Sequence, residues 1–101
     1  MWAQMQRVST NPEKEARVLE IFERLRGIEQ EDSGLLQTLV MRSQADPTEV
    51  FVLVVFESEE KARARDKDPR RQEPLQRIRS AMGDVLNGPP TFFDCNVLLN
   101  R

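Results

Sequence analysis

Glu49-Val-Phe-Val-Leu-Val-Val-Phe-Glu-Ser58 decides the fold of this chain, because it places seven consecutive apolar residues between two carboxylates. Most of the seven are β-branched or aromatic and none is Gly or Pro, which favours a strand over a helix. Alternate side chains of a strand point to opposite faces. One face would carry Phe51, Leu53 and Val55, and the other Val50, Val52, Val54 and Phe56. Both faces need cover, and we expect the chain's own helices on one and a partner subunit on the other.

Length and composition predict a single domain over residues 1–101. Charged residues make up 32% and apolar residues 39% of the chain. No apolar run approaches the roughly 20 residues that span a bilayer, and the first residues do not resemble a signal peptide. A single cysteine excludes an intrachain disulfide and suits a reducing compartment. We therefore expect a cytoplasmic protein with no membrane partner.

The absence of His and the single Cys limit the kinds of metal and haem site that the chain can form. With no His and one Cys, zinc and haem sites built on imidazole or paired thiolates are excluded, so no metal and no cofactor is predicted. The net charge of −2 argues against a nucleic-acid partner. A basic cluster is interleaved with carboxylates, which is typical of a solvated helix face. Its members are Arg63, Arg65, Lys67, Arg70 and Arg71.

The local patterns predict the element order β-α-β-β-α-β. Asn11-Pro12-Glu13 is a helix start, and Asp68-Pro69 breaks the second helical region. The predicted strands are residues 2–9, 35–43, 49–58 and 92–99, and the predicted helices are residues 12–30 and 59–86, the latter in two segments. This order predicts an α+β, ferredoxin-like antiparallel sheet with the first and third strands in the middle and the helices on one face.

The uncovered sheet face is predicted to form a homodimer interface, since a large apolar face usually marks an interaction site. Two such sheets packed face to face would make an α+β barrel. The residues expected there are Met5, Leu35, Leu39, Met41, Phe51, Leu53 and Val55.

Glu57-Ser58-Glu59-Glu60 directly after an apolar strand, the broken helix that follows, and an opening strand that runs into Asn11-Pro12-Glu13 resemble the antibiotic biosynthesis monooxygenase family. The resemblance covers essentially the whole chain. It implies a dimeric α+β barrel with a pocket between each sheet and its helices. It also implies activities that range from cofactor-independent oxygenation of quinols and polyketide aromatics to haem degradation.

The haem-degrading branch can be compared residue by residue. It uses an Asn on the first strand, and a Trp and then a His in the helix after the third strand. Those places hold Gln6, Arg65 and approximately Leu75 in this sequence. Haem degradation is therefore not expected.

Five residues are candidates for substrate binding: Trp2, Gln4, Gln6, Asp94 and Asn96. The resemblance implies that the strand face with Trp2, Gln4 and Gln6 looks toward the helices and the pocket, where Gln6 would hydrogen-bond a carbonyl or phenol and Trp2 would stack on an aromatic ring. The alternative is that the strand end tolerates polar residues and Trp2 caps the core. Asp94 and Asn96 share a face of the last strand and could converge with Gln6. Asp94 could be a general base if burial raised its pKa, or simply an edge-strand charge.

Three further side chains have structural explanations beside functional ones. Arg7 and Arg42 could anchor an anionic substrate, but ion pairs at the strand ends explain them as well. Cys95 has no His to activate it, and its apolar neighbours predict a buried structural thiol. No residues are spaced as a nucleophile with its base.

Two functions remain open at this stage, and the catalytic residues are unknown. The first is a cofactor-independent monooxygenase that acts on a small aromatic, quinol-type substrate. The second is a non-catalytic binding or regulatory protein of the same fold, whose pocket its own side chains fill. An open cavity lined by Gln6, Trp2 and Asn96 would favour the first.

Overall fold

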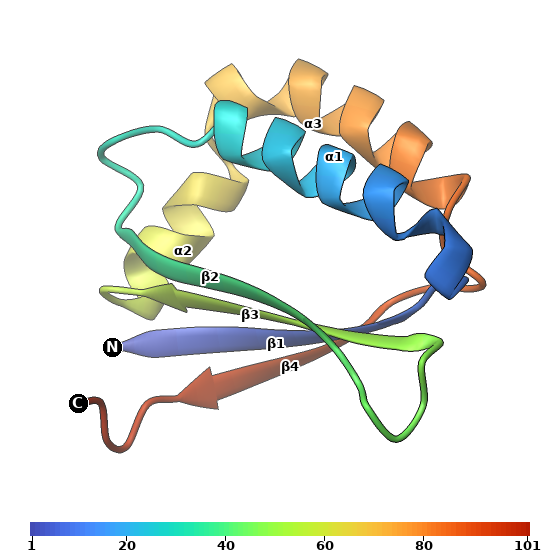
Figure 1. The fold of residues 1–101 in the computed structure, drawn as a ribbon. Helices are drawn as coiled ribbons and strands as arrows, with labels where there is room; N and C mark the ends of the chain where they lie inside the picture. Colours follow the sequence, from blue (N-terminus) through green and yellow to red (C-terminus); the bar gives the residue numbers. More distant parts are fainter.

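A four-stranded antiparallel sheet with three α-helices over one face makes up the computed structural model, which describes residues 1–101 (Figure 1). The strand order is β2-β3-β1-β4, with every neighbouring pair antiparallel. This confirms the α+β, ferredoxin-like fold. The elements are β1 (Trp2–Ser9), the 3-10 turn η1 (Pro12–Lys14), α1 (Glu15–Gly27), β2 (Leu35–Arg42), β3 (Glu49–Phe56), α2 (Glu59–Asp66), α3 (Pro69–Gly83) and β4 (Thr91–Asn96).

Polar side chains cap the starts of η1, α2 and α3, whereas α1 continues directly from η1 without a side-chain cap. The Asn11 side chain accepts a hydrogen bond from the Glu13 backbone N–H at 2.9 Å. Ser58 Oγ accepts one from the Lys61 backbone at 3.2 Å at the start of α2. Asp68 caps α3, so the Asp68-Pro69 pair both ends one helix and starts the next.

Several predicted elements are too long at their C-terminal ends. The helices α1 and α3 end at Gly27 and Gly83 rather than at residues 30 and 86. The strands β3 and β4 end at Phe56 and Asn96 rather than at residues 58 and 99. Beyond Asn96 no element of the chain packs against the apolar side chains, since Leu98 is 95% and Leu99 75% exposed. None of the helices combines the length and the apolar character that a membrane span requires.

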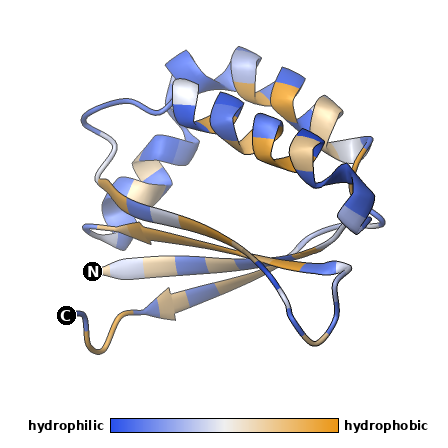
Figure 2. Cartoon of the chain, viewed as in Figure 1, coloured by the Kyte–Doolittle hydropathy of each residue, from blue (hydrophilic) through white to orange (hydrophobic).

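The core lies between the helices and the even-numbered face of the sheet (Figure 2). Val50, Val52 and Phe56 of β3 are buried there, each at most 4% exposed. The helices supply Val18 and Ile21 of α1 and Ile78 of α3. The helices therefore cover the Val50 face of the central strand and leave the Phe51 face open.

The expected side-chain alternation fails at the start of β2. Leu35 pairs with Phe56 but Gln37 pairs with Val55, so the pairing shifts at Leu36. Because of this irregularity, Leu35 packs with Phe56 and Trp2 on the helix side. Its assignment to the open sheet face is wrong.

The rest of the open face keeps the predicted alternation. Leu39 is 41% and Met41 37% exposed, and Leu53 and Phe51 are half-buried. Val55 is only 8% exposed within the single chain. The contribution of this face to a dimer remains a prediction.

Candidate functional site

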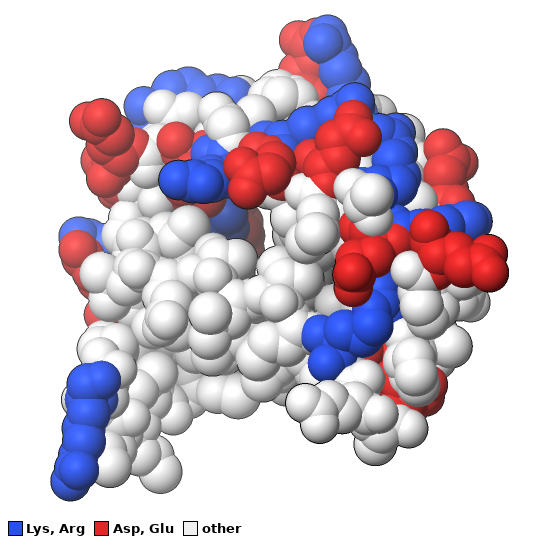
Figure 3. All heavy atoms as spheres, viewed as in Figure 1, with Lys and Arg blue, Asp and Glu red and all other residues white.

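A cavity of about 1060 Å³ lies between the sheet and the helices α1 and α3. Apolar side chains form 12 of its 25 lining residues. They include Phe22, Leu25, Leu75, Ile78 and Met82 from the helices and Val40, Val52 and Val54 from the sheet. Figure 3 shows the surface hollowed where the charged helices meet the uncharged side of the sheet. Concave apolar spaces with a few polar groups are the usual form of small-molecule sites.

Two glutamines of β1 place amides on the cavity wall. Gln4 and Gln6 are both half-buried lining residues, as the even-numbered face predicts. Gln4 Nε2 donates to Asp94 Oδ1 at 3.0 Å across the β1–β4 pair. No such bond holds the Gln6 amide, which can therefore turn toward a bound molecule.

The other three candidates lie apart from the cavity lining. Trp2 is 5% exposed and packs against Phe56 and Ala62, with the Arg63 guanidinium 5.0 Å from its ring centroid. Asn96 is exposed opposite Trp2 at the end of β4. Trp2 thus occupies the core, which was the alternative interpretation.

Asp94 accepts a hydrogen bond from Gln4 and none from Gln6, with which it was expected to converge. Hydrogen bonds from Gln4 and from Arg63, which lies 2.9 Å from Asp94 Oδ2, hold the pKa of Asp94 below its ordinary value. Burial has not raised it, so Asp94 is a weak base. Its role in the structure is to connect β1, β4 and α2.

An ion cluster of Glu29, Arg65 and Arg71 forms the polar end of the cavity. Arg65 donates from both Nε and Nη2 to the Glu29 carboxylate, with its shortest contacts at 2.7 and 2.8 Å. Arg71 Nη1 lies 3.3 Å from Glu29 Oε1. Arg65 and Glu29 are each 16% exposed and Arg71 only 3%. The interpretation of the basic cluster as a solvated helix face is therefore wrong for Arg65 and Arg71.

The environment of this cluster moves the pKa values of its members. Burial raises the pKa of Glu29, but hydrogen bonds from Arg65 and Ser33 and the charges of both arginines outweigh it, so the net pKa is lowered. Burial and then the neighbouring Arg65 charge lower the pKa of Arg71. The cluster is charged at neutral pH, with two positive groups around one negative group.

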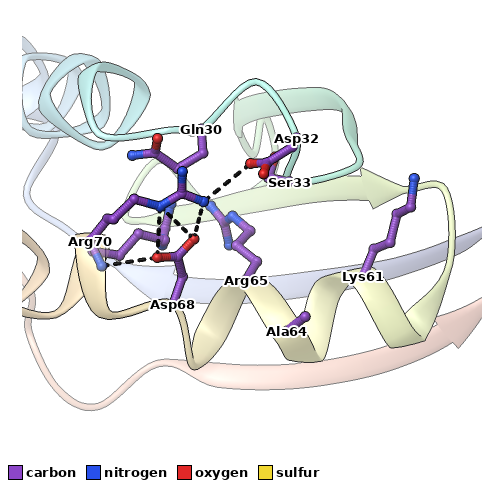
Figure 4. A pocket seen from close by; sticks show the side chains of 9 residues that line it. Gln30, Asp32, Ser33, Lys61, Ala64, Arg65, Asp68 and Arg70 are labelled. Atoms are coloured by element: carbon purple, nitrogen blue, oxygen red, sulfur yellow. Dashed lines mark hydrogen bonds and ion pairs between the residues drawn. The ribbon is translucent and has the colours of Figure 1, made fainter.

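A second, polar pocket of about 140 Å³ lies behind this cluster (Figure 4). Arg70 there reaches Asp32 at 3.2 Å and also binds Asp68, as the dashed lines in Figure 4 show. Arg65 and Arg71 line both spaces. The two arginines thus form the wall between the apolar cavity and the polar pocket.

The family profile of the antibiotic biosynthesis monooxygenases matches residues 1–87. The chain belongs to this family. No protein with a curated description matches it significantly.

Solved structures of the antibiotic biosynthesis monooxygenase family share the fold. A provisionally named member from Caulobacter crescentus superimposes with a TM-score of 0.78 at 16% identity, over 97% of this chain and 90% of the other. One from Bordetella bronchiseptica gives 0.76 at 17% identity, over 97% of both chains. A point mutant of SnoaB from Streptomyces nogalater, described as a cofactor-independent oxygenase, gives 0.76 at 11% identity, over 98% and 94%. At these identities the likeness shows the fold.

The three positions compared with the haem-degrading branch of the family all line the cavity. Gln6, Arg65 and Leu75 stand there, and the chain contains no His. None of them is a haem-iron ligand, and Arg65 is tied to Glu29. The residues of this antibiotic biosynthesis monooxygenase family member do not fit haem.

The remaining side chains singled out from the sequence have surface positions. Cys95 is exposed, so the expectation of a buried thiol is wrong. It lies on β4, an edge strand that no element of the chain covers. Arg7 pairs with Glu49 at 3.7 Å and Arg42 with Glu15 at 3.0 Å, which are ion pairs near strand ends. No three carboxylates or thiols come together as metal ligands.

Proposed function

We propose that this family member is a cofactor-independent monooxygenase that binds a flat aromatic, quinol-type substrate in the cavity between sheet and helices. The observation that carries the proposal is the cavity itself, about 1060 Å³, with apolar side chains as 12 of its 25 lining residues and the Gln6 amide among the polar ones. A fused-ring aromatic matches such a space in size and polarity. The family name supports the reaction type.

The proposed reaction needs only the substrate and molecular oxygen. An anthrone-type CH2 group loses a proton to water, and the resulting carbanion gives its electron pair to O2 to form a C–O bond. The peroxide takes up the proton and loses water, which leaves a carbonyl in place of the CH2. The substrate supplies the electrons, and O2 ends as the carbonyl oxygen and one water.

The protein would favour this reaction by stabilising the substrate anion. Gln6 can donate a hydrogen bond to the oxygen on which the negative charge develops, and the bound aromatic substrate would itself displace water from the cavity. Neither Glu29 nor Asp94 has a raised pKa, so neither suits the role of a strong general base. Anion stabilisation therefore carries more of the proposed catalysis than proton abstraction.

Oxygen uptake tests the proposal. Reduced naphthoquinols and anthrones are incubated with the protein under air, and oxygen consumption is followed with an electrode. We expect protein-dependent uptake, with the anthrone converted to its anthraquinone as in the reaction above. A naphthoquinol that is only oxidised to its quinone, with H2O2 as the other product, would indicate an oxidase and not a monooxygenase. Gln6→Leu, which keeps the side-chain size, should slow turnover roughly three- to tenfold, the loss of one neutral hydrogen bond. Gln76→Leu, on the exposed face of α3, is the matched control and should leave the rate unchanged. No uptake above the protein-free rate would refute the oxygenase function.

A non-catalytic binding protein of the same fold is the second candidate. The lowered pKa values of both carboxyls favour it, because the site lacks an evident proton acceptor. The version in which the protein's own side chains fill the pocket has no support, since the cavity is open. Binding of the oxidised quinone without oxygen uptake by the quinol would identify this second function.

We further propose that the protein works as a homodimer in the cytoplasm. The open face of the sheet, with Leu39, Met41 and Leu53 on neighbouring strands, provides the interface. Apolar faces of this kind are usually buried against a partner.

A further inference from the structure

Arg71 is the most deeply buried charged residue of the chain, at 3% exposed. It stands in the first turns of α3 and lines the large cavity. A buried guanidinium is retained in proteins when its N–H groups find acceptors. The acceptors of the Arg71 N–H groups therefore determine whether its burial is stable.

Most of those donors have no acceptor in the chain. Arg71 Nη1 has a single long contact of 3.3 Å to Glu29 Oε1. Its Nε is the one buried side-chain nitrogen or oxygen of the protein that has no hydrogen-bond partner. An unmade hydrogen bond at a buried donor costs free energy, and an arriving acceptor would recover it.

The nearby carboxylates leave Arg71 weakly paired. Glu29 is held mainly by Arg65, which takes both of its oxygens in a bidentate contact. Asp66, another carboxylate of the cavity lining, lies 4.0 Å from Arg65 Nη1 and forms no ion pair with Arg71. The 3.3 Å contact to Glu29 is therefore the single ion pair of Arg71, which leaves its other N–H groups available to a further acceptor.

We propose that the Arg71 end of the cavity binds a carboxylate carried by the flat apolar ligand. The inference rests on the proposed function in so far as the cavity must be a ligand site, and it adds the ligand's class: an aromatic carboxylic acid. The Nε and Nη edge of an arginine matches the two oxygens of a carboxylate in a bidentate pair. The aromatic body would then lie along Leu75 and Ile78, which line the same cavity.

The contact requires a small movement of Arg71. Its Nε is closed off from solvent, so the guanidinium must turn for this edge to meet a ligand oxygen. The single 3.3 Å contact to Glu29 resists that turn only weakly, whereas Arg65 is held by three contacts. Arg71 is thus the arginine of the pair that is free to bind a ligand.

Calorimetric titration with 2-naphthoate and 2-naphthamide tests the inference, since the two probes share the ring and differ in charge. We expect the full-length protein to bind naphthoate at least about tenfold more tightly than the amide, because a buried charge-assisted pair is strong. Arg71→Met should remove this preference, weakening naphthoate about tenfold and leaving naphthamide unchanged. Arg71→Lys keeps the positive charge but cannot make the bidentate contact of a guanidinium, so it should retain part of the preference for naphthoate. Arg77→Met, on the exposed face of α3, should behave as the unmodified protein.

The outcomes separate this inference from the oxygenase proposal. Equal binding of both probes by the unmodified protein, or binding of neither, overturns the carboxylate site even if the Arg71 variants fail to fold. Naphthoate preference that survives in Arg71→Met also overturns it. Naphthoate preference that depends on Arg71, found together with no oxygen uptake from any quinol, would leave the inference standing and refute the oxygenase.

Discussion

Replacing Glu29 by glutamine removes the only carboxylate that Arg65 and Arg71 share. The variant keeps the size of the side chain but leaves Arg71, 3% exposed, without an ion-pair partner and Arg65, 16% exposed, with only a 4.0 Å contact to Asp66. Breaking a fully buried pair in this way costs about 3–5 kcal/mol. Because Glu29 and Arg65 retain some contact with water, we expect Glu29→Gln to lower the free energy of unfolding by about 2–4 kcal/mol.

Thermal unfolding followed by circular dichroism measures this loss. For a domain of this size, each kcal/mol lowers the melting temperature by roughly 4–8 °C, so we expect a drop of roughly 8–32 °C. Glu20→Gln is the matched control, since Glu20 bridges Arg17 and Arg24 on the exposed face of α1. It should cost less than about 0.5 kcal/mol.

At acid pH, Glu29→Gln and the unmodified protein should have the same melting temperature. The pKa of Glu29 is lowered in the folded state, so its contribution is fully present above the ordinary value of 4.5. It is lost as the pH falls through the lowered folded value. The two melting curves should therefore converge in acid. A Glu29→Gln protein that melts within about 2 °C of Glu20→Gln at pH 7 would refute the stabilising role of the ion cluster.

Three further changes test other parts of the structure. Gly34→Ala should destabilise the fold by about 1–2 kcal/mol in urea unfolding, because the residue has a φ of +81° and a methyl there would lie 2.6 Å from a side-chain carbon; Gly27→Ala, where nothing lies within 4 Å, should be neutral or stabilising. Hydrogen bonds from the Arg70 side chain and backbone N–H lower the pKa of Asp68 from 3.8 to about 2, so the stabilisation by Asp68 is present above pH 3.8 and lost as the pH falls through about 2; the melting temperature should fall less steeply in this range for Asp68→Asn. Leu53→Asp should yield monomer or aggregate in sedimentation, while Ser80→Asp and the unmodified protein sediment at twice 11.7 kDa; a monomeric unmodified protein at micromolar concentration would contradict the dimer.

The order and type of the elements could be predicted because local chemistry determines them. Asn11-Pro12 and Asp68-Pro69 start helices whatever lies around them, and the apolar run of β3 suits only a strand covered on both faces. The predicted topology followed from that order. The ends of the elements were predicted less accurately, because the sequence does not show where neighbouring elements cease to pack against a helix or strand.

The errors concern contacts between distant segments. Leu35 was placed on the wrong face because a shift in strand pairing leaves no mark in the sequence. Arg65 and Arg71 share the charge pattern of a surface helix, and only the fold brings Glu29 to them. Of the candidate site, alternation along β1 correctly placed Gln4 and Gln6 toward the helices. The ion cluster of Glu29, Arg65 and Arg71 was not predicted. Its one sign in the sequence is the position of Glu29, a carboxylate just after an amphipathic helix.

The strand order β2-β3-β1-β4 also dictates when the sheet can assemble. Only β2 and β3 are joined by a short turn, so their hairpin can form as soon as both strands have left the ribosome. The first strand to be synthesised, β1, must wait for β3 on one edge and for the last strand, β4, on the other, where Ala3 pairs with Cys95. Contacts between such distant residues form slowly, since a long loop must close before they are made. We therefore expect the β1–β4 pair to form last, and a ribosome-bound chain in which β4 is not yet made would carry β1 with an unpaired edge open to other strands.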